Sequence, residues 1–233
     1  MPVAEGAQIT LLHVIPRSLP PRAQRRAAAD ARKALAAKAT SLARTLPKGI
    51  EVEPIAAVGD PAGEIAKRAG TLGVELIVMG RGGRRALRDT FLGSTAERVI
   101  RRGQLPVLVV RLPPRGRYRR PALALDLDQA AGRVVELLIR VLPRPSPSVA
   151  VIHAYDIPYR GMIYPSLSED DAEEYEEEYR ERALREVQKL LATSLSKAKV
   201  ASIDAPSWKL HVRDGSPRIV IEKAVRKGGA DIL

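Results

Sequence analysis

The sequence predicts an α/β protein made of two doubly wound, parallel-sheet domains. Short aliphatic runs alternate with segments rich in Ala, Arg, Lys and Leu along the 233 residues, and this alternation is typical of a parallel sheet covered by helices. The run VELIVM has no alternation of apolar and polar residues, so we expect both of its faces to be buried. The same order of segments then occurs again in the second half of the chain.

The first half is expected to hold four strands separated by three helices. The predicted strands are residues 8–15, 50–58, 74–79 and 106–111, and the predicted helices are residues 22–46, 61–72 and 94–102. Pro61 suits the first turn of a helix, where a proline costs no hydrogen bond. The prolines and the glycine that follow the predicted strand 106–111 indicate a linker. We therefore expect a first domain over residues 1–112, a linker over 113–120 and a second domain over 121–233.

The second half follows the same plan. The predicted strands are residues 122–127, 148–155, 210–213 and 230–233, and the predicted helices are residues 128–142, 169–195 and 217–227. The long helix over 169–195 is acidic in its first half, which complements the helix dipole. We interpret this acidic half as a solvated face; a docking site for a basic partner is the alternative.

An internal repeat can be read directly from the sequence. LLHV at residues 11–14 matches VIHA at 151–154 with an offset of 140, and GDP at 59–61 matches GSP at 215–217 with an offset of 156. The change of offset places 16 additional residues between the second and third strands of the second domain. These offsets also predict that the first domain lacks its opening strand and helix, and that the second lacks its glycine loop, last helix and last strand.

Composition and charge exclude several classes of protein. The chain has no cysteine and three scattered histidines, which excludes a disulfide scaffold and argues against an obvious metal site. No apolar run is long enough for a membrane span, and no signal peptide is recognisable, so we expect a cytoplasmic protein. Residues 1–118 hold 21 Lys and Arg against 9 Asp and Glu, whereas the remainder is balanced at 18 against 18. The excess charge in the first half predicts an anionic partner or a solvated basic surface.

A glycine-rich segment follows the buried strand that ends at Met79. It begins Gly80-Arg81-Gly82-Gly83 and, after nine intervening residues, ends at Gly93-Ser94-Thr95, where a helix starts. Glycines let a backbone approach a ligand closely, and the free N–H groups at a helix start favour an anion. The segment is neither a Walker loop nor a dinucleotide fingerprint. Phosphate binding and an ordinary tight turn both fit the glycine spacing alone.

The spacing Gly80-x2-Gly83-x9-Gly93-Ser94 resembles the signature of universal stress proteins. The flanking runs LIVM and PVLVV, together with LLHVIP and GDP, are also similar to that family, over nearly the whole chain as a tandem pair. The resemblance implies a Rossmann-like, five-stranded parallel sheet in the order 3-2-1-4-5. It also implies binding of ATP, with or without Mg²⁺, without strong catalytic activity.

The resemblance assigns roles to particular residues. It implies ribose and phosphate contacts from Gly80, Gly83, Gly93, Ser94 and Thr95, and packing near the adenine or sugar from Val14 and Met79. Apart from the resemblance, the arginines around the loop, among them Arg84, are expected either to neutralise phosphates or to form a solvated rim; they are Arg81, Arg84, Arg85 and Arg88. The family's aspartate at the end of the first strand has its counterpart in Asp126, a remnant in the second domain. Neither domain is therefore expected to hold a complete site. Either the chain is cut or its start wrongly assigned, or strand 122–127 crosses over to complete the first domain.

Two classes of function remain from the sequence. The first is a nucleotide-binding stress-response module that acts by association, and the second is a docking protein that uses its basic first domain without nucleotide. An ATP hydrolase is the enzyme alternative, but no Walker lysine, magnesium carboxylate or base is evident near the loop. Nucleic-acid binding is disfavoured because stacking aromatics are scarce. The edge strand 106–111 predicts pairing in a homodimer or between tandem domains.

Overall fold

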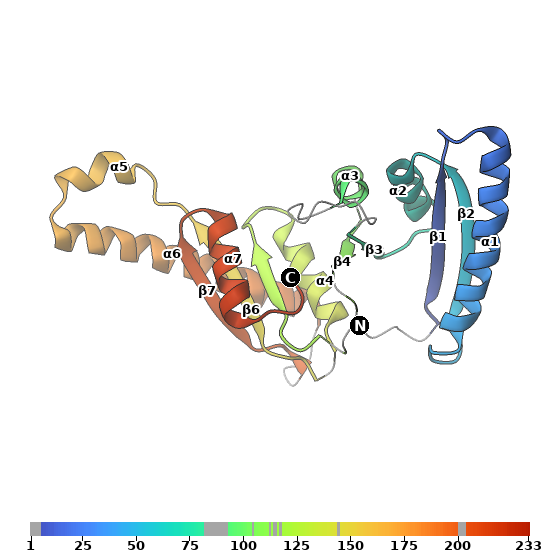
Figure 1. Cartoon of the computed structure of the whole chain (residues 1–233). Coiled ribbons are helices and arrows are strands. Elements are labelled where there is room, and N and C mark those ends of the chain that lie inside the picture. Colours follow the sequence, from blue (N-terminus) through green and yellow to red (C-terminus); the bar gives the residue numbers. More distant parts are fainter. Residues whose placement is uncertain are drawn as a thin grey trace. The chain divides into compact units, whose positions relative to one another are not determined.

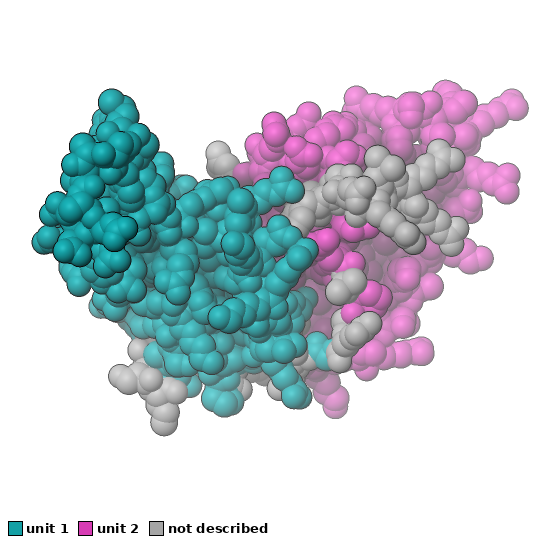
Figure 2. Space-filling model, turned by 60° about the vertical axis from the view of Figure 1, so that its left-hand side comes forward, with its two compact units in different colours: residues 1–2, 116–233 teal, residues 3–115 magenta. Residues whose placement is uncertain are grey.

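The chain forms two compact units, each built from parallel strands and helices (Figure 1). The computed structural model describes residues 6–81, 93–103, 105–111, 113, 116, 118–143, 145–199 and 204–233. One unit comprises residues 3–115 and is called the N-terminal unit. The other comprises residues 116–233 with residues 1–2 and is called the C-terminal unit (Figure 2).

The C-terminal unit contains a regular parallel sheet. Its elements are β5 (Ala122–Leu125), α4 (Ala131–Val141), β6 (Val149–Tyr155), α5 (Arg160–Ile163), η1 (Tyr164–Ser166), α6 (Glu169–Lys197), β7 (Trp208–Asp214) and α7 (Pro217–Gly228). The strand order is β7-β6-β5, and Pro121 forms a further parallel bridge with Ile232 on the other side of β5. β7, β6, β5 and the Ile232 bridge correspond to positions 3, 2, 1 and 4 of the predicted order 3-2-1-4-5. β5 therefore takes the central position.

Helices cover both faces of that sheet. On one face α4 and α6 pack on β5 and β6 through a cluster that includes Leu123, Val135, Val151 and Leu191. On the other face α7 packs through Val220 against Ala122 and Ile152. Because β5 has buried side chains on both faces, it reads in the sequence as a continuous apolar run rather than an alternating one.

The N-terminal unit holds two separate two-stranded sheets. Its elements are β1 (Gln8–Pro16), α1 (Pro21–Ala43), β2 (Glu51–Gly59), α2 (Pro61–Thr71), β3 (Ile77–Gly80), α3 (Ser94–Arg102) and β4 (Val107–Val110). Among the described residues β1 pairs only with β2, and β3 pairs only with β4. The two pairs correspond to 3-2 and 4-5 of the predicted order, and no described strand of this unit lies between them.

The hypothesis that strand 122–127 crosses over into the N-terminal unit is wrong. That strand, β5, pairs with β6 throughout its length, and Ala122 donates a backbone hydrogen bond to Ile232 at 2.8 Å. Both edges of β5 are therefore used within its own unit. Buried Leu123 and Leu125 hold it there, because moving the strand would expose them.

Three further expectations need correction. Strand 74–79 begins only at Ile77, since β4 offers its first partner there, through the Pro106 carbonyl. The expected strand 230–233 consists of a single bridge at Ile232. The short helices α5 and η1 were not predicted; they make up part of the additional length between β6 and β7 and form, with the start of α6, an arm that extends from the sheet (Figure 1).

Candidate functional site

The predicted loop leaves the carboxyl end of β3, as the glycine pattern requires. Gly80 is the last residue of β3, is exposed, and lies opposite Val110 of β4. Met79 precedes it, half-buried, opposite Val109. Ligands of open α/β sheets bind outside the carboxyl ends of the strands. The described residues therefore place the start of the loop at the edge where a ligand is expected.

The loop ends at the N-terminus of α3, which has no side-chain cap. Gly93, the residue before the helix, has φ −72° and ψ 150°. As a glycine it has no hydroxyl or carboxylate that could accept hydrogen bonds from the first-turn N–H groups. Ser94 is exposed and Thr95 is half-buried on the first turn. By contrast, α2 and α6 are capped by the side chains of Asp60 and Ser168. An uncapped helix start keeps its N–H groups and positive dipole end for an anion.

The other predicted site residues either belong to other elements or lie outside the described part of the chain. Gly83 and Arg84 lie outside the described residues, as do Arg85 and Arg88. Val14 lies on β1, in the sheet that shares no strand pairing with β3. Asp126 follows β5 in the C-terminal unit and is exposed. Of the predicted loop, the described residues comprise the two ends, Gly80–Arg81 and Gly93–Thr95.

An ion-pair cluster at the turn after β2 was missed in the sequence. Asp60 accepts hydrogen bonds from Gly63 N at 2.9 Å, Arg98 Nη2 at 2.6 Å and Arg102 Nη1 at 2.9 Å. The Gly63 N–H and the two guanidinium groups lower the pKa of Asp60 below its ordinary value. The cluster connects the start of α2 to α3. Arg98 and Arg102 lie four residues apart and therefore share one face of the helix. This spacing is the feature of the sequence that could have indicated that both arginines donate to one carboxylate.

Gly63 allows this cluster to close. A Cβ on Gly63 would lie 3.1 Å from Asp60 Oδ2 and 3.2 Å from Arg102 Nη1. A side chain there would push apart Asp60 and Arg102, which join α2 to α3. At Gly59, a Cβ would lie 2.4 Å from Cγ of Glu64, whose carboxylate pairs with Arg68 of the same helix at 3.3 Å.

The described residues show neither a metal cluster nor a membrane span. No group of three or more His, Asp or Glu side chains is placed among them to bind a metal ion. None of the helices in the described part of the chain combines the length and the apolar character needed to cross a bilayer. A shallow hollow along α2, lined by Glu64, Arg68 and Leu72, contains none of the predicted site residues.

Comparison with known proteins gives a consistent family match. The universal stress protein family model matches residues 2–111 and 117–233. The universal stress protein MJ0577 of Methanocaldococcus jannaschii is 44% identical over 63 residues, which are 27% of this chain and 39% of that protein. YxiE of Bacillus subtilis, also a universal stress protein, is 44% identical over 64 residues, 28% of this chain and 43% of that protein. These matches span well under half the length of each relative.

Solved structures resemble the chain over nearly all of its length. A universal stress protein from Archaeoglobus fulgidus superimposes with a TM-score of 0.68 at 20% identity, covering 97% of this chain and 75% of that one. The functionally unknown protein PA1789 of Pseudomonas aeruginosa has a TM-score of 0.52 at 18% identity, covering 96% of this chain and 79% of that one. At these identities the likeness shows the fold, in two tandem copies.

Proposed function

The chain belongs to the universal stress protein family, and we propose that it binds ATP at the β3–α3 segment of its N-terminal unit. It acts by binding and association rather than by catalysis. The observation that carries the proposal is the uncapped, glycine-preceded start of α3, joined by the signature spacing to Gly80 at the end of β3. The triphosphate lies against the N–H groups of that helix start, with Mg²⁺ as its counterion in solution.

The chemistry of the segment fits a phosphate better than a metal or a covalent reaction. The N–H groups and the Ser94 and Thr95 hydroxyls donate hydrogen bonds to oxygen anions. Arg81 is half-buried beside Gly80 and adds a positive charge. The one carboxylate in the first turn of α3, Glu97, is engaged by Arg101 at 3.3 Å.

Calorimetric titration of the full chain with Mg·ATP tests the proposal. Gly93→Val is expected to abolish binding, because a branched side chain stands where the phosphate approaches. The φ of −72° is open to valine, and circular dichroism with a thermal melt of the variant checks that the buried position accepts it without loss of the fold. Gly70→Ala is the matched control, since Gly70 lies in α2 and a Cβ there meets nothing within 4 Å. Binding of equal strength by Gly93→Val and the parent chain contradicts this site.

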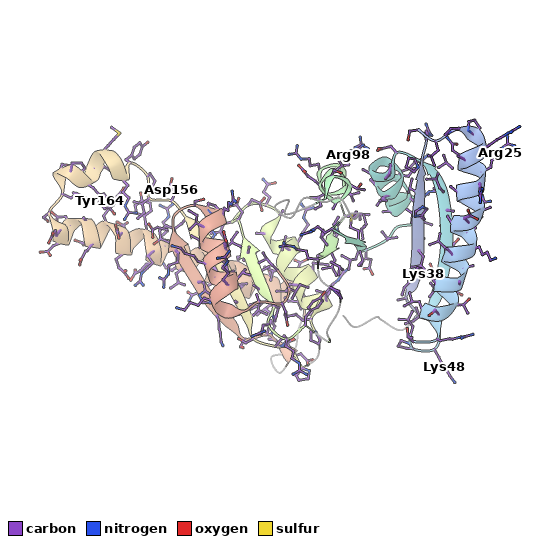
Figure 3. The ribbon with its side chains drawn as sticks, viewed as in Figure 1. Arg25, Lys38, Lys48, Arg98, Asp156 and Tyr164 are labelled. Carbon is purple, nitrogen blue, oxygen red and sulfur yellow. The ribbon has the colours of Figure 1, made fainter. Side chains whose placement is uncertain are left out.

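A second candidate function rests on the basic surface of α1. This helix exposes Arg22, Arg25, Arg26, Arg32, Lys33 and Lys38 against the single acidic residue Asp30. Arg25 points away from the β1–β2 sheet (Figure 3). Docking of an acidic partner on α1 would be weakened by reversing these charges and unchanged by Gly93→Val, so the two functions separate in one pair of variants.

Self-association through β4 is part of the proposal. In the described part of the chain, one edge of β4 pairs with β3 and the other carries no strand. Edge strands of this kind pair with other chains unless they are blocked. Sedimentation of the chain over a concentration series tests this, and Val109→Pro is expected to prevent such pairing because proline cannot donate to a ladder.

A further inference from the structure

One side of α1 combines small residues with unpaired cations, and we call it the basic face. Ala29, Ala36 and Ala43 recur every seven residues along this side and are exposed. At about 3.6 residues per turn, five cations lie on the same side of the helix; they are Arg22, Arg25, Arg26, Arg32 and Lys33. All five are exposed and form no ion pair among the described residues. Their charge is therefore available to a partner.

A hollow continues the basic face toward the end of α1. It has a volume of about 580 Å³ and lies between α1 and β2, with Ala36, Thr40 and Ala43 on one side and Val52 and Pro54 on the other. The short side chains on α1 leave room for a second helix to approach closely. The aliphatic stems of the neighbouring arginines can then lie along that helix while their charged ends reach its carboxylates. The face thus fits an elongated, acidic element.

The C-terminal unit shows that a neighbouring helix does not cover this side. With the offset of 156, Ala36 corresponds to Ala192 of α6, which is exposed. The helix α4 approaches α6 at Ser194 instead, where a Cβ on Gly132 would lie 3.9 Å from the Ser194 hydroxyl oxygen. Ser194 corresponds to Lys38, which lies on the opposite side of α1 from Ala36. The basic face is therefore a surface that stays free when the helix beside it is present.

The start of α6 carries the complementary charge. Residues 169–181 hold nine Asp and Glu against one Arg. Five of these carboxylates are exposed and form no ion pair among the described residues; they are Glu169, Asp170, Glu173, Glu174 and Glu178. The other side of α6 is occupied by the arm itself, since Arg160 pairs with Glu176 and the Tyr164 ring packs on Tyr175 (Figure 1). Asp170, Glu174 and Glu178 thus form an acidic face turned away from α5 and η1.

We propose that the basic face of α1 binds the acidic face of α6 of a second copy of this chain, helix against helix. Asp170, Glu174 and Glu178 are spaced one turn apart, and so are Arg22 and Arg26, so neighbouring turns of the two helices bring opposite charges together. A single exposed ion pair contributes little, and the contact therefore depends on the whole row. This inference rests on the docking function proposed for α1 and not on nucleotide binding.

Sedimentation velocity of the full chain over a concentration series tests the contact. Association is expected at about 50 mM NaCl and is expected to be lost at about 500 mM, because exposed charges are screened by salt. Two triple variants reverse one face each: Arg22→Glu, Arg26→Glu and Lys33→Glu on α1, and Asp170→Lys, Glu174→Lys and Glu178→Lys on α6. Each variant alone is expected to weaken the salt-dependent association at least about tenfold.

Mixing the two variants is the decisive step. An equimolar mixture is expected to associate again, because the reversed α1 of one chain matches the reversed α6 of the other. The matched control, Arg218→Glu with Lys223→Glu and Lys227→Glu, changes the net charge equally on exposed positions of α7 and is expected to leave association unchanged. A mixture that stays monomeric, while circular dichroism shows both variants folded, overturns the proposal. So does association of both variants as strong as that of the parent chain, which is the result of pairing through β4 alone.

Titration with poly-L-glutamate separates this inference from the docking function on which it rests. The parent chain is expected to bind this acidic probe in competition with its own association, and the α1 triple variant is expected not to bind it. A parent chain that binds the probe but is monomeric at low salt docks an acidic partner other than a second copy, and this overturns the inference while the docking function stands. A parent chain that does neither overturns both.

Discussion

Arg98 Nη2 of α3 lies 2.6 Å from Oδ1 of Asp60, the residue that caps α2. The pair joins the turn that follows β2 to the helix that opens at the proposed phosphate site. Within the N-terminal unit the β1–β2 and β3–β4 sheets share no strand pairing, so side-chain bonds between α2 and α3 help to hold the two halves together. The same two helices also carry buried apolar side chains, Ala69 in α2 and Ala96 and Val99 in α3.

The Asp60 carboxylate makes this connection depend on pH. The Gly63 N–H, Arg98 and Arg102 lower the pKa of Asp60 in the folded state. The contribution of Asp60 to the free energy of unfolding is therefore present above the ordinary carboxyl pKa of about 3.9, and it is lost as pH falls through the lower pKa of the folded state. Asp60→Asn is expected to remove this acid dependence while keeping an oxygen that caps α2. Thermal melts between about pH 3 and pH 7 measure the difference.

Comparison of Asp60→Ala with Asp60→Asn separates the cap from the ion pairs, because the alanine loses both and the asparagine keeps the cap. Hydrogen exchange in α3 is expected to be faster in both variants than in the parent chain, and exchange at the start of α2 faster in Asp60→Ala than in Asp60→Asn. Arg101→Ala is the control, because Arg101 pairs with Glu97 of its own helix and not with Asp60. Equal exchange in α3 for Asp60→Ala and the parent chain would show that Asp60 does not hold that helix.

The order and type of most elements could be predicted because each carries a local signal. Buried strands such as β6 are uninterrupted aliphatic runs, and α2 follows an Asp-Pro pair that supplies both a cap and a first-turn proline. The internal repeat also predicted that the first unit lacks its opening strand and helix; among the described residues, the β1–β2 and β3–β4 sheets share no strand pairing.

Other features depended on contacts between distant residues and had no local signal. The bond between His153 and the Leu125 carbonyl joins residues 28 apart in the sequence. The α5 helix begins after Tyr159, which has a positive φ of 58° without being glycine. Its position is set by Arg160, which pairs with Glu176 of α6 and Asp214 of β7, a combination that no spacing in the sequence indicates.

Arg160 is expected to fix the arm formed by α5, η1 and the start of α6. It donates to Asp214 Oδ2 at 2.7 Å and to Glu176, and its guanidinium lies 5.0 Å from the centre of the Tyr164 ring. Arg160→Ala should therefore speed hydrogen exchange in α5 and η1 while leaving β6 unchanged. Arg182→Ala, which removes only an exposed pair with Glu186 at 3.6 Å, is the control and should leave the arm unchanged.

Two tyrosines on the arm predict a measurable titration. Tyr175 OH lies 3.4 Å from Tyr179 OH, and this hydrogen bond raises the pKa of Tyr175 to about 12. Because the pKa of Tyr175 is raised in the folded state, its stabilisation of the fold is present below the ordinary tyrosine pKa of about 10. This stabilisation is lost as pH rises toward the folded-state pKa. Tyr179→Phe is expected to lower the Tyr175 pKa toward the ordinary value in an ultraviolet titration. An unchanged titration in Tyr179→Phe would rule out this hydrogen bond as the cause.

Leu191 tests how far the C-terminal unit depends on packing between α6 and the sheet. It is 3% exposed and belongs to the cluster that includes Val135, Val151 and Val187. Leu191→Ala is expected to lower the free energy of unfolding by about 2–5 kcal/mol, from lost apolar burial and the cavity left behind. Thr193→Ala, two residues away and exposed, is the control and should change stability little, because its hydroxyl bonds only the Lys189 carbonyl of its own helix. If both variants unfold at the same denaturant concentration as the parent chain, α6 does not pack on β5 and β6 as described.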